Sequence, residues 1–261
     1  MSRGMTIADF VQQVLYAIYK VRLDVSDSVD GNFHSKSDKF KEVVMEANMV
    51  LQELQKDADW NWLRERWEMG IAHSHHGDVQ EFELPDWVYK PCTGYGDAVR
   101  LHCPGMPPMQ IPWTSPRMGN RIYKKMFDSD GRINPYEIEQ QAFQIGNIVT
   151  FKRPWLPGER GMLIETDVIR RMEPLHICDD SCPDHCPESY KNLVFTEIPD
   201  PYYMIVKTAA KRAEGDPSAI DRVQSLTDEA TKMMSAMREN DSAHTTPDMY
   251  ETSELGYVEV Y

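Results

Sequence analysis

The spacing of apolar residues changes twice along this 261-residue chain and divides it into helical ends and a β-rich middle. Apolar residues follow helical spacing in residues 1–66 and again in 193–238. Residues 67–175 instead carry short alternating or apolar runs broken by proline and glycine, which is typical of β-strands. We therefore predict an α+β fold, with a helical bundle built from N-terminal and C-terminal helices and an inserted antiparallel β module.

Two helices are predicted near the start of the chain. Thr6, with Asp9 three residues later, matches a capping box, which is a common helix start. One face of the helix that follows is marked by Ile7, Phe10, Val11, Val14, Leu15 and Ile18. After a polar stretch, the face of a second and longer helix is marked by Phe40, Val43, Val44, Ala47, Leu51, Leu54 and Ala58.

Two more helices are predicted near the other end. Pro199 and Pro201 introduce a short apolar helix, which Gly215 ends. Asp216 then caps a further helix that has Pro217 at its first position. We expect the buried stripe of this helix to consist of Ile220, Val223, Leu226, Ala230, Met233, Met234 and Met237.

Three tryptophans stand where the helical pattern gives way to the β pattern: Trp60, Trp62 and Trp67. Large buried aromatic side chains usually belong to the core, so we interpret them as a hinge packed between two subdomains. A ligand platform is the alternative interpretation.

The clearest part of the β region spans residues 142–171. The runs GNIVTFK and GMLIETDVI flank the loop RPWLPGER, which contains two prolines and a glycine. We predict that these two runs are antiparallel neighbours in one β-hairpin.

Residues 239–261 carry six acidic residues and no lysine or arginine, and are expected to form an extended arm that is disordered by itself. The residues at its end nevertheless have strand-forming character. We therefore hypothesise that the arm binds the portal or adds to a neighbouring subunit through Leu255, Tyr257, Val258, Val260 and Tyr261.

Composition narrows the possible environments and partners. Forty-two acidic against 28 basic residues give a formal charge of -14, which disfavours a surface that grips nucleic-acid phosphates. No stretch is apolar for the roughly 18 residues that a membrane helix needs. The start of the chain does not match a signal peptide, so we expect the mature protein to begin at Met1. Five cysteines are not the framework of a secreted disulfide-rich protein, which favours synthesis in a reducing cytoplasm.

A cysteine- and proline-rich loop, residues 176–192, is the strongest candidate for a metal site. It contains five potential zinc ligands, namely Cys178, Cys182, Cys186, His176 and His185. The three cysteines stand four residues apart on one loop, whereas structural zinc sites usually combine two separated knuckles. A structural zinc, a disulfide or partner contact, and unreactive loop thiols therefore all stay open.

Other polar clusters predict no chemistry. The segment 126–137 resembles a calcium-binding loop through Asp128, Asp130, Asn134 and Glu137, but its first ligand position holds Met126, so a polar turn is favoured. His73, His75 and His76 lack a carboxylate at helical spacing and are expected to be exposed. The chain also lacks the motifs of nucleotide-binding loops and of serine hydrolases, so we do not expect an enzyme.

The order of these segments resembles the head-to-tail adaptor proteins of tailed bacteriophages, also called connector or head completion proteins. The resemblance rests on four pieces: the helix pair that leads to ADWNWLRERW, the predicted hairpin QIGNIVTFKRPWLPGERGMLIETDVI, the proline-led helix EIPDPYYMIVKTAAKRAEGD, and the closing helix PSAIDRVQSLTDEATKMMSAMREND with its tail. The cysteine-rich loop does not belong to this pattern.

The resemblance implies a structural subunit of the virion, made in the host cytoplasm and located in the neck between head and tail. Such subunits form a ring of about twelve copies beneath the portal protein, with the helical bundle around the portal axis and the β module facing the tail or nozzle protein. The C-terminal extension is implied to hold the portal. DNA passes through the ring during ejection without sequence-specific binding, and no membrane is involved.

Two other functions stay open at this point. A zinc-binding interaction module centred on residues 176–188 is the main alternative. A metal-assisted hydrolase that uses Asp128, Asp130 and Glu137 ranks third, because no second cluster completes such a site.

Overall fold

The computed structural model describes residues 5–20, 38–71, 81–94, 97–119, 136, 138–176 and 193–243. The chain divides into two compact units. The first combines Met1–Trp62 with Met172–Tyr261, and the second is Leu63–Arg171. The first unit is mainly helical and the second consists mainly of antiparallel strands, so the α+β class is confirmed.

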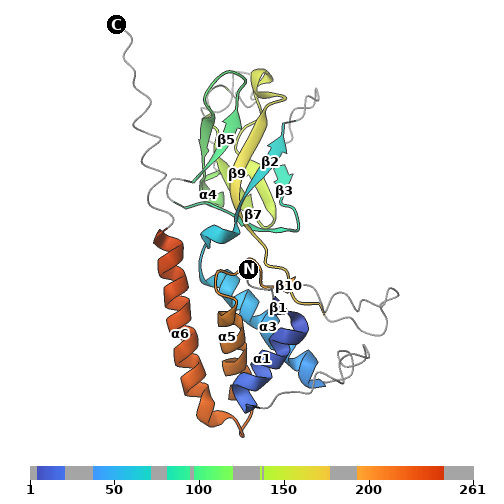
Figure 1. Ribbon diagram of the computed structural model, residues 1–261. Helices are drawn as coiled ribbons and strands as arrows, with labels where there is room; N and C mark the ends of the chain where they lie inside the picture. Colours follow the sequence, from blue (N-terminus) through green and yellow to red (C-terminus); the bar gives the residue numbers. More distant parts are fainter. Residues whose placement is uncertain are drawn as a thin grey trace, which may run out of the picture. The chain divides into compact units, whose positions relative to one another are not determined.

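Four helices make up most of the described part of the first unit (Figure 1): α1 (Ile7–Tyr19), α3 (Asp38–Asp57), α5 (Tyr202–Glu214) and α6 (Ile220–Ala243). Helix α5 contacts each of the other three. Two short strands, β1 (Met5–Thr6) and β10 (Leu193–Val194), pair antiparallel and join the start of α1 to the segment that precedes α5. Segments from both ends of the chain therefore share one core, which we call the helical unit.

The first two helices follow their sequence signals. The Thr6 hydroxyl accepts a hydrogen bond from the backbone N–H of Asp9 at 3.2 Å, and the Thr6 N–H donates to the Asp9 carboxylate at 3.3 Å, so the capping box is present. All six apolar residues predicted to mark the face of α1 are buried. Every predicted core residue of α3 from Phe40 to Leu54 is buried too, but the helix ends at Asp57, so Ala58 lies outside it and is only half-buried.

Helix α6 starts three residues later than predicted. The Asp216 carboxylate accepts hydrogen bonds from the N–H and the hydroxyl of Ser218, at 2.9 and 2.7 Å, and residues 217–219 form turns. Ile220 consequently lies at the start of the helix and is 64% exposed, so its predicted place in the buried stripe is wrong. Leu226, Ala230 and Met237 are buried as expected, whereas Val223, Met233 and Met234 are only half-buried.

Helix α6 also ends later than predicted, because it continues to Ala243 and not to residue 238. The Asp241 carboxylate accepts a hydrogen bond from the Asn61 N–H at 3.0 Å, and the Asn61 side chain donates to the Asp241 carbonyl at 3.0 Å. These bonds attach the last turn of α6 to the segment after α3. The predicted boundary of the arm at 239 is therefore wrong, because its first residues are helical.

The second unit, which we call the β unit, contains two antiparallel sheets. The larger one has β2 (Arg64–Gly70), β9 (Leu163–Arg170), β5 (Ala98–His102) and β6 (Met109–Pro112) in that order, while β4 (Val88–Pro91) pairs with the far end of β9. The smaller one has the order β3 (Glu81–Glu83), β8 (Ile148–Phe151) and β7 (Ala142–Ile145). A bridge between Trp113 and Ala142 links the segment after β6 to β7.

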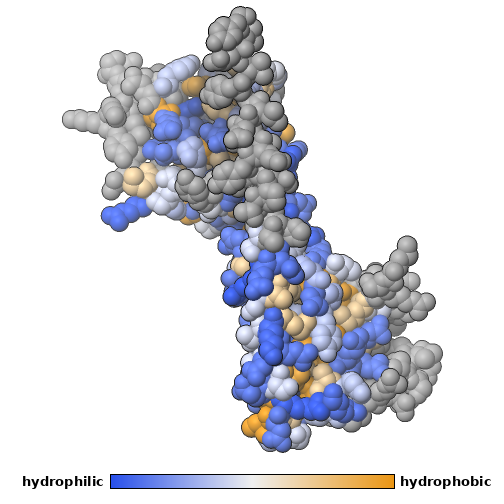
Figure 2. Space-filling model, turned by 60° about the vertical axis from the view of Figure 1, so that its left-hand side comes forward, coloured by the Kyte–Doolittle hydropathy of each residue, from blue (hydrophilic) through white to orange (hydrophobic). Residues whose placement is uncertain are grey.

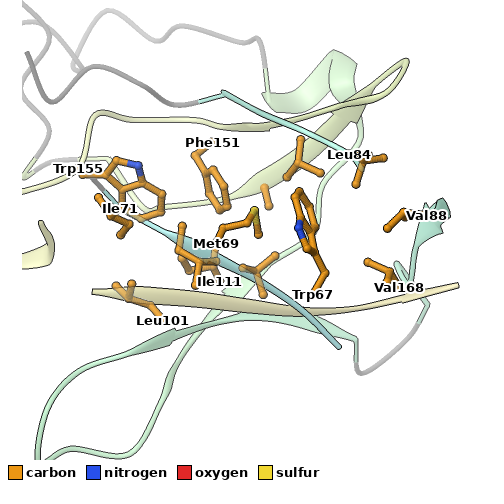
Figure 3. Close-up of a cluster of buried hydrophobic side chains, with 14 residues drawn as sticks. Trp67, Met69, Ile71, Leu84, Val88, Leu101, Ile111, Phe151, Trp155 and Val168 are labelled. Carbon is orange, nitrogen blue, oxygen red and sulfur yellow. The ribbon is translucent and has the colours of Figure 1, made fainter. Parts of the chain in front are cut away.

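One apolar core lies between these sheets. Trp67 and Met69 alternate with exposed residues along β2, as a half-buried strand requires, and Ile164 and Val168 face inward from β9. Figure 3 shows Trp67, Met69 and Val168 of the larger sheet in one cluster with Phe151 of β8 and Trp155 of the loop that follows it. The rings of Phe151 and Trp155 lie 4.7 Å apart. The inserted segment therefore has a hydrophobic core of its own.

The hairpin predicted for residues 142–171 is wrong in its pairing. Strand β8 pairs with β7 through a two-residue turn, Gly146–Asn147, in which Gly146 has a φ of 62°. Strand β9 belongs to the other sheet and pairs with β2, β4 and β5. The loop between β8 and β9 contains a short 3-10 helix, η5 (Pro157–Glu159), and leads the chain from one sheet to the other.

The three tryptophans do not form one cluster. Trp60 is fully buried in the helical unit, and its indole N–H donates to the Leu54 carbonyl at 2.8 Å. Its ring lies 5.8 Å from that of Trp62, in the 3-10 turn η2 (Asn61–Leu63). Trp67 packs in the core of the β unit. Trp60 and Trp67 are core residues, each in its own unit.

Candidate interaction surfaces

Ion pairs attach α5 and α6 to α3. Arg212 of α5 contacts two carboxylates of α3, those of Glu42 and Glu46, the latter at 3.2 Å, and Lys211 pairs with Glu53. Burial raises the pKa of Glu46 although Arg212 donates to it, because removal from water disfavours the charged carboxylate. Arg238 of α6 pairs with Asp57 at the end of α3, so ion pairs hold both α5 and α6 against α3.

A second polar contact connects the end of α1 to the turn before α6. The Tyr19 hydroxyl donates to the Asp216 carboxylate. This bond is the largest cause that lowers the pKa of Asp216 to about 2, and Ser218 adds to it. The same bond raises the pKa of Tyr19, since the proton is held between the two groups. Arg222 of α6 also donates to the Ala17 carbonyl at 2.6 Å.

A groove of about 490 Å³ lies next to this contact, between α1, α5 and α6. Its floor includes the buried side chains of Ile205 and Leu226. Two tyrosines line it and are about half exposed, Tyr16 at 46% and Tyr202 at 49%. Lys20 stands over the Tyr16 ring, 5.3 Å from its centre. Half-exposed aromatic rings beside charges are typical of protein–protein contact surfaces.

A pair of methionines projects from α3. Met45 is 63% exposed and Met49 is 49% exposed, and their spacing of four residues places them on successive turns of one helix face. Figure 2 shows apolar patches among hydrophilic ones on the surface of the helical unit. We call Met45 and Met49 the methionine ridge.

A smaller cavity of about 210 Å³ lies beside β10. Its lining is mostly apolar and includes Leu51, Trp62 and Phe195. Phe195 has a φ of 57°, which is strained for an aromatic residue, and its ring packs edge-on against Phe10 with 5.0 Å between the centres. His176, one of the five predicted metal ligands, contributes to the wall of this cavity.

The larger sheet of the β unit carries a charged outer face. Glu165 of β9 has a side chain that is only 5% exposed, and it lies 2.7 Å from the Arg100 guanidinium and 3.3 Å from that of Arg66. Arg100 also donates to Asp167 at 2.9 Å. His102 lies 3.3 Å from the other oxygen of Glu165. Because Glu165 and Asp167 both have arginine partners, the centre of this face is a network of ion pairs.

Most predicted site residues fall outside the described residues. These are Cys178, Cys182, Cys186 and His185 of the metal candidate, Asp128, Asp130 and Glu137 of the calcium-like segment, the histidines at 73, 75 and 76, and Leu255, Tyr257, Val258, Val260 and Tyr261 of the arm. His176 alone is described, and the described residues contain no group of three or more histidine, cysteine, aspartate or glutamate side chains that could hold a metal ion. Zinc binding by this loop and the contacts of the arm stay predictions.

Comparison with known proteins identifies no relative. No protein family matches the chain, and no curated protein matches its sequence. Among the described residues, no helix is both long and apolar enough to cross a membrane.

The sequence carries signals for the groove and the methionine ridge that differ from the buried stripes. Tyr16 lies off the buried stripe of α1, and Met45 and Met49 lie off that of α3. An apolar residue on the polar side of an amphipathic helix is the pattern that marks such surfaces. Helical periodicity identifies the buried stripe and does not by itself point to apolar residues on the opposite face.

Proposed function

We propose that this chain is a subunit of the ring that joins the portal to the tail in a tailed bacteriophage, and that its role is structural and not catalytic. The observation that carries the proposal is the insertion of a β unit with its own core into a helical unit made from both ends of the chain. A ring subunit needs a rigid part around the axis and a separate module for its neighbours, and this architecture supplies both.

Three of the four pieces of the resemblance support the proposal. The helix pair that leads to Trp60, the short α5 and the closing α6 are all present, although α6 has different limits. The remaining piece, the predicted single hairpin, does not support the proposal, because its two strands lie in different sheets. The architecture supports the proposal more strongly than any motif does.

The charge of the chain suits the proposed position. With a formal charge of -14, the subunit repels the phosphates of DNA that passes through the ring, which keeps the passage free. In the proposed assembly the partners are other copies of the chain, the portal protein above and a tail or nozzle protein below, and the site of action is the neck of the virion.

Electron microscopy and native mass spectrometry test the proposal. The purified chain is examined alone and then mixed with the portal protein of the same phage. Rings of about twelve copies that cap the portal are expected. A chain that remains monomeric and ignores the portal contradicts the proposal, and stoichiometric zinc in that monomer supports the zinc-binding interaction module.

A further inference from the structure

Three sulfur-containing side chains lie at one end of the larger sheet of the β unit. Cys103 directly follows β5, Met162 directly precedes β9, and Met109 is the first residue of β6. Strand β5 lies between β9 and β6, so the three residues belong to neighbouring strands. The Cys103 thiol donates to the Met162 thioether, with 3.4 Å between the two sulfur atoms. We call these three residues the sulfur cluster.

The register of the strands places Met109 on the same face as the other two sulfurs. Met109 pairs with Leu101, which is buried in the core of the β unit. Side chains two residues apart on a strand share a face, so Cys103 lies on the Leu101 side, and it packs against the same core. Cys103 and Met109 are therefore diagonal neighbours on adjacent strands, about 7–8 Å apart at Cα, which a long side chain can bridge.

The sulfur cluster is open to solvent on one side and closed by the core on the other. Met109 is 43% exposed, whereas Cys103 and Met162 are half-buried. The core against which Cys103 and Met162 pack contains Leu101 and Ile164, both fully buried. An ion can therefore reach the sulfurs from solution. The apolar side favours a complex without net charge, since burial of a charge is costly.

The donors of this site are sulfur atoms alone. His102 precedes Cys103, but its side chain lies on the opposite face of the sheet, 3.3 Å from Glu165. A structural zinc takes four ligands from cysteine, histidine and acidic residues, and the described residues contain no group of even three of these. Thiolate and thioether ligands are soft and suit Cu(I), whereas hard cations require oxygen ligands.

We propose that the sulfur cluster binds one Cu(I) ion, with Cys103 as a thiolate ligand and Met109 and Met162 as thioether ligands. On binding, the S–H bond of Cys103 breaks and a Cu–S bond forms. The proton passes to solvent, and no electron is transferred. The positive ion and the thiolate neutralise each other, which suits the apolar side of the cluster.

The geometry needs only a small adjustment. With metal–sulfur bonds of about 2.3 Å, the length of a zinc–thiolate bond, two ligands at an angle of about 120° have their sulfur atoms about 4.0 Å apart. The sulfur atoms of Cys103 and Met162 are 3.4 Å apart before any ion is bound. Methionine is unbranched and has three rotatable bonds, so Met162 can retreat and Met109 can approach without movement of the strands.

Alkylation of Cys103 in the full chain measures whether the ion is bound. Iodoacetamide modifies a free thiol much faster than a metal-bound thiolate, and mass spectrometry of the digested protein reports Cys103 separately from the other four cysteines. Free Cu(I) is set under anaerobic conditions with the chelator bicinchoninate, so that binding by other thiols does not deplete it. We expect Cu(I) to protect Cys103, and Zn(II) at the same free concentration to leave its alkylation unchanged.

Met109→Leu and Met162→Leu each remove one thioether and nearly conserve the side-chain volume. Loss of a residue that merely orients a metal ligand weakens binding about 10–100-fold, so we expect loss of a ligand to raise the free Cu(I) needed for half protection by at least about tenfold. Met118→Leu is the matched control. Met118 belongs to α4 (Pro116–Gly119) of the same unit and is also 43% exposed, and its replacement is expected to leave protection unchanged.

Any of three results overturns the inference. Cys103 of the wild type is not protected at any free Cu(I) concentration at which circular dichroism shows a folded chain. Protection is the same in the wild type and in either Met109→Leu or Met162→Leu, which shows that the thiol binds the ion without that thioether. Zn(II) protects Cys103 as well as Cu(I) does, which shows that the thioethers do not select the ion. Ring formation is not part of this measurement, so the inference does not depend on the proposed function.

Discussion

At the scale of single residues, buried charges determine how the β unit holds its loops. Arg153 and Glu159 are both nearly inaccessible and form two parallel hydrogen bonds of 2.7 and 2.8 Å. The Glu159 carboxylate also accepts from the Leu156 N–H at 2.7 Å, and Gln140 bonds to the backbone of Arg153 in both directions. This network fixes the loop that carries the chain from the smaller sheet to the larger one.

We predict that Arg153→Met lowers the free energy of unfolding of the β unit by about 3–5 kcal/mol. The substitution leaves the Glu159 carboxylate buried without its cation, which is the costly way to break a buried ion pair. Urea denaturation followed by circular dichroism measures the change. Arg64→Met is the matched control, since its pair with Asp97 is longer, at 3.5 Å, and more exposed, and its loss costs less than about 1 kcal/mol. Equal effects of the two substitutions contradict the prediction.

Tyr203 predicts how stability changes at high pH. Burial raises the pKa of its hydroxyl to about 12, and the carboxylates of Asp57 and Glu53 add to the shift. The folded state therefore keeps this proton between pH 10 and 12 while the unfolded chain loses it. Because the folded pKa is the higher one, the stabilisation is complete below pH 10 and is lost as the pH rises toward 12.

Tyr203→Phe is expected to make the loss of stability less steep in that range, by up to about 1.4 kcal/mol per pH unit, which corresponds to one proton. Urea denaturation at several values of pH between 9 and 12 measures the slope. Tyr202→Phe serves as the control, because the Tyr202 side chain lies next to Tyr203 in the sequence but is 49% exposed. The same slope in wild type and Tyr203→Phe argues against a raised pKa.

At the scale of elements, helices were predicted better than strand pairing. The stripes of α1 and α3 are local patterns, and a helix forms its hydrogen bonds within one segment, so the sequence was sufficient. The runs that became β8 and β9 were recognised too, but their partners lie in different sheets. Periodicity does not encode which strand pairs with which. The Gly146–Asn147 dipeptide was the available signal for the β7–β8 hairpin.

The C-terminal end of α6 depended on a side chain far away in the sequence. Asn61 precedes Asp241 by 180 residues, and no local signal predicts that they meet. For the same reason the groove was not predicted, since it combines side chains from α1, α5 and α6. Tertiary contacts determined these features.

The revised end of α6 leads to a prediction about truncation. A chain that ends at Ala243 is expected to be as stable as the full chain, whereas one that ends at Met237 loses Asp241 and Arg238, which binds Asp57. The part-buried bonds from Asn61 to the Asp241 carboxylate involve a charged acceptor, and such bonds contribute about 1.5–3 kcal/mol, so the loss of Asp241 alone is expected to cost the shorter chain about that much. Thermal and urea denaturation of both truncated chains measure the difference. Equal stability of the two contradicts the helical assignment of residues 238–243.

At the scale of the whole molecule, net charge and the pairing of basic residues indicate whether a protein binds DNA. Proteins that bind duplex DNA gain affinity when their basic residues release counterions from phosphates, so that affinity falls steeply with added salt. This chain has an excess of 14 acidic residues, and the basic residues on the outer face of its larger sheet are paired with Glu165 and Asp167. Little positive charge remains there to attract DNA.

We therefore predict that the full chain, alone or assembled, does not bind duplex DNA at physiological salt, and that lowering the salt concentration does not produce binding. Fluorescence anisotropy of a labelled duplex, titrated with the protein at several salt concentrations, measures this. A basic DNA-binding protein of similar size shows that the assay detects binding. Affinity that falls as salt is added would reveal a basic surface that the net charge conceals, and would contradict the passive DNA passage of the proposed function.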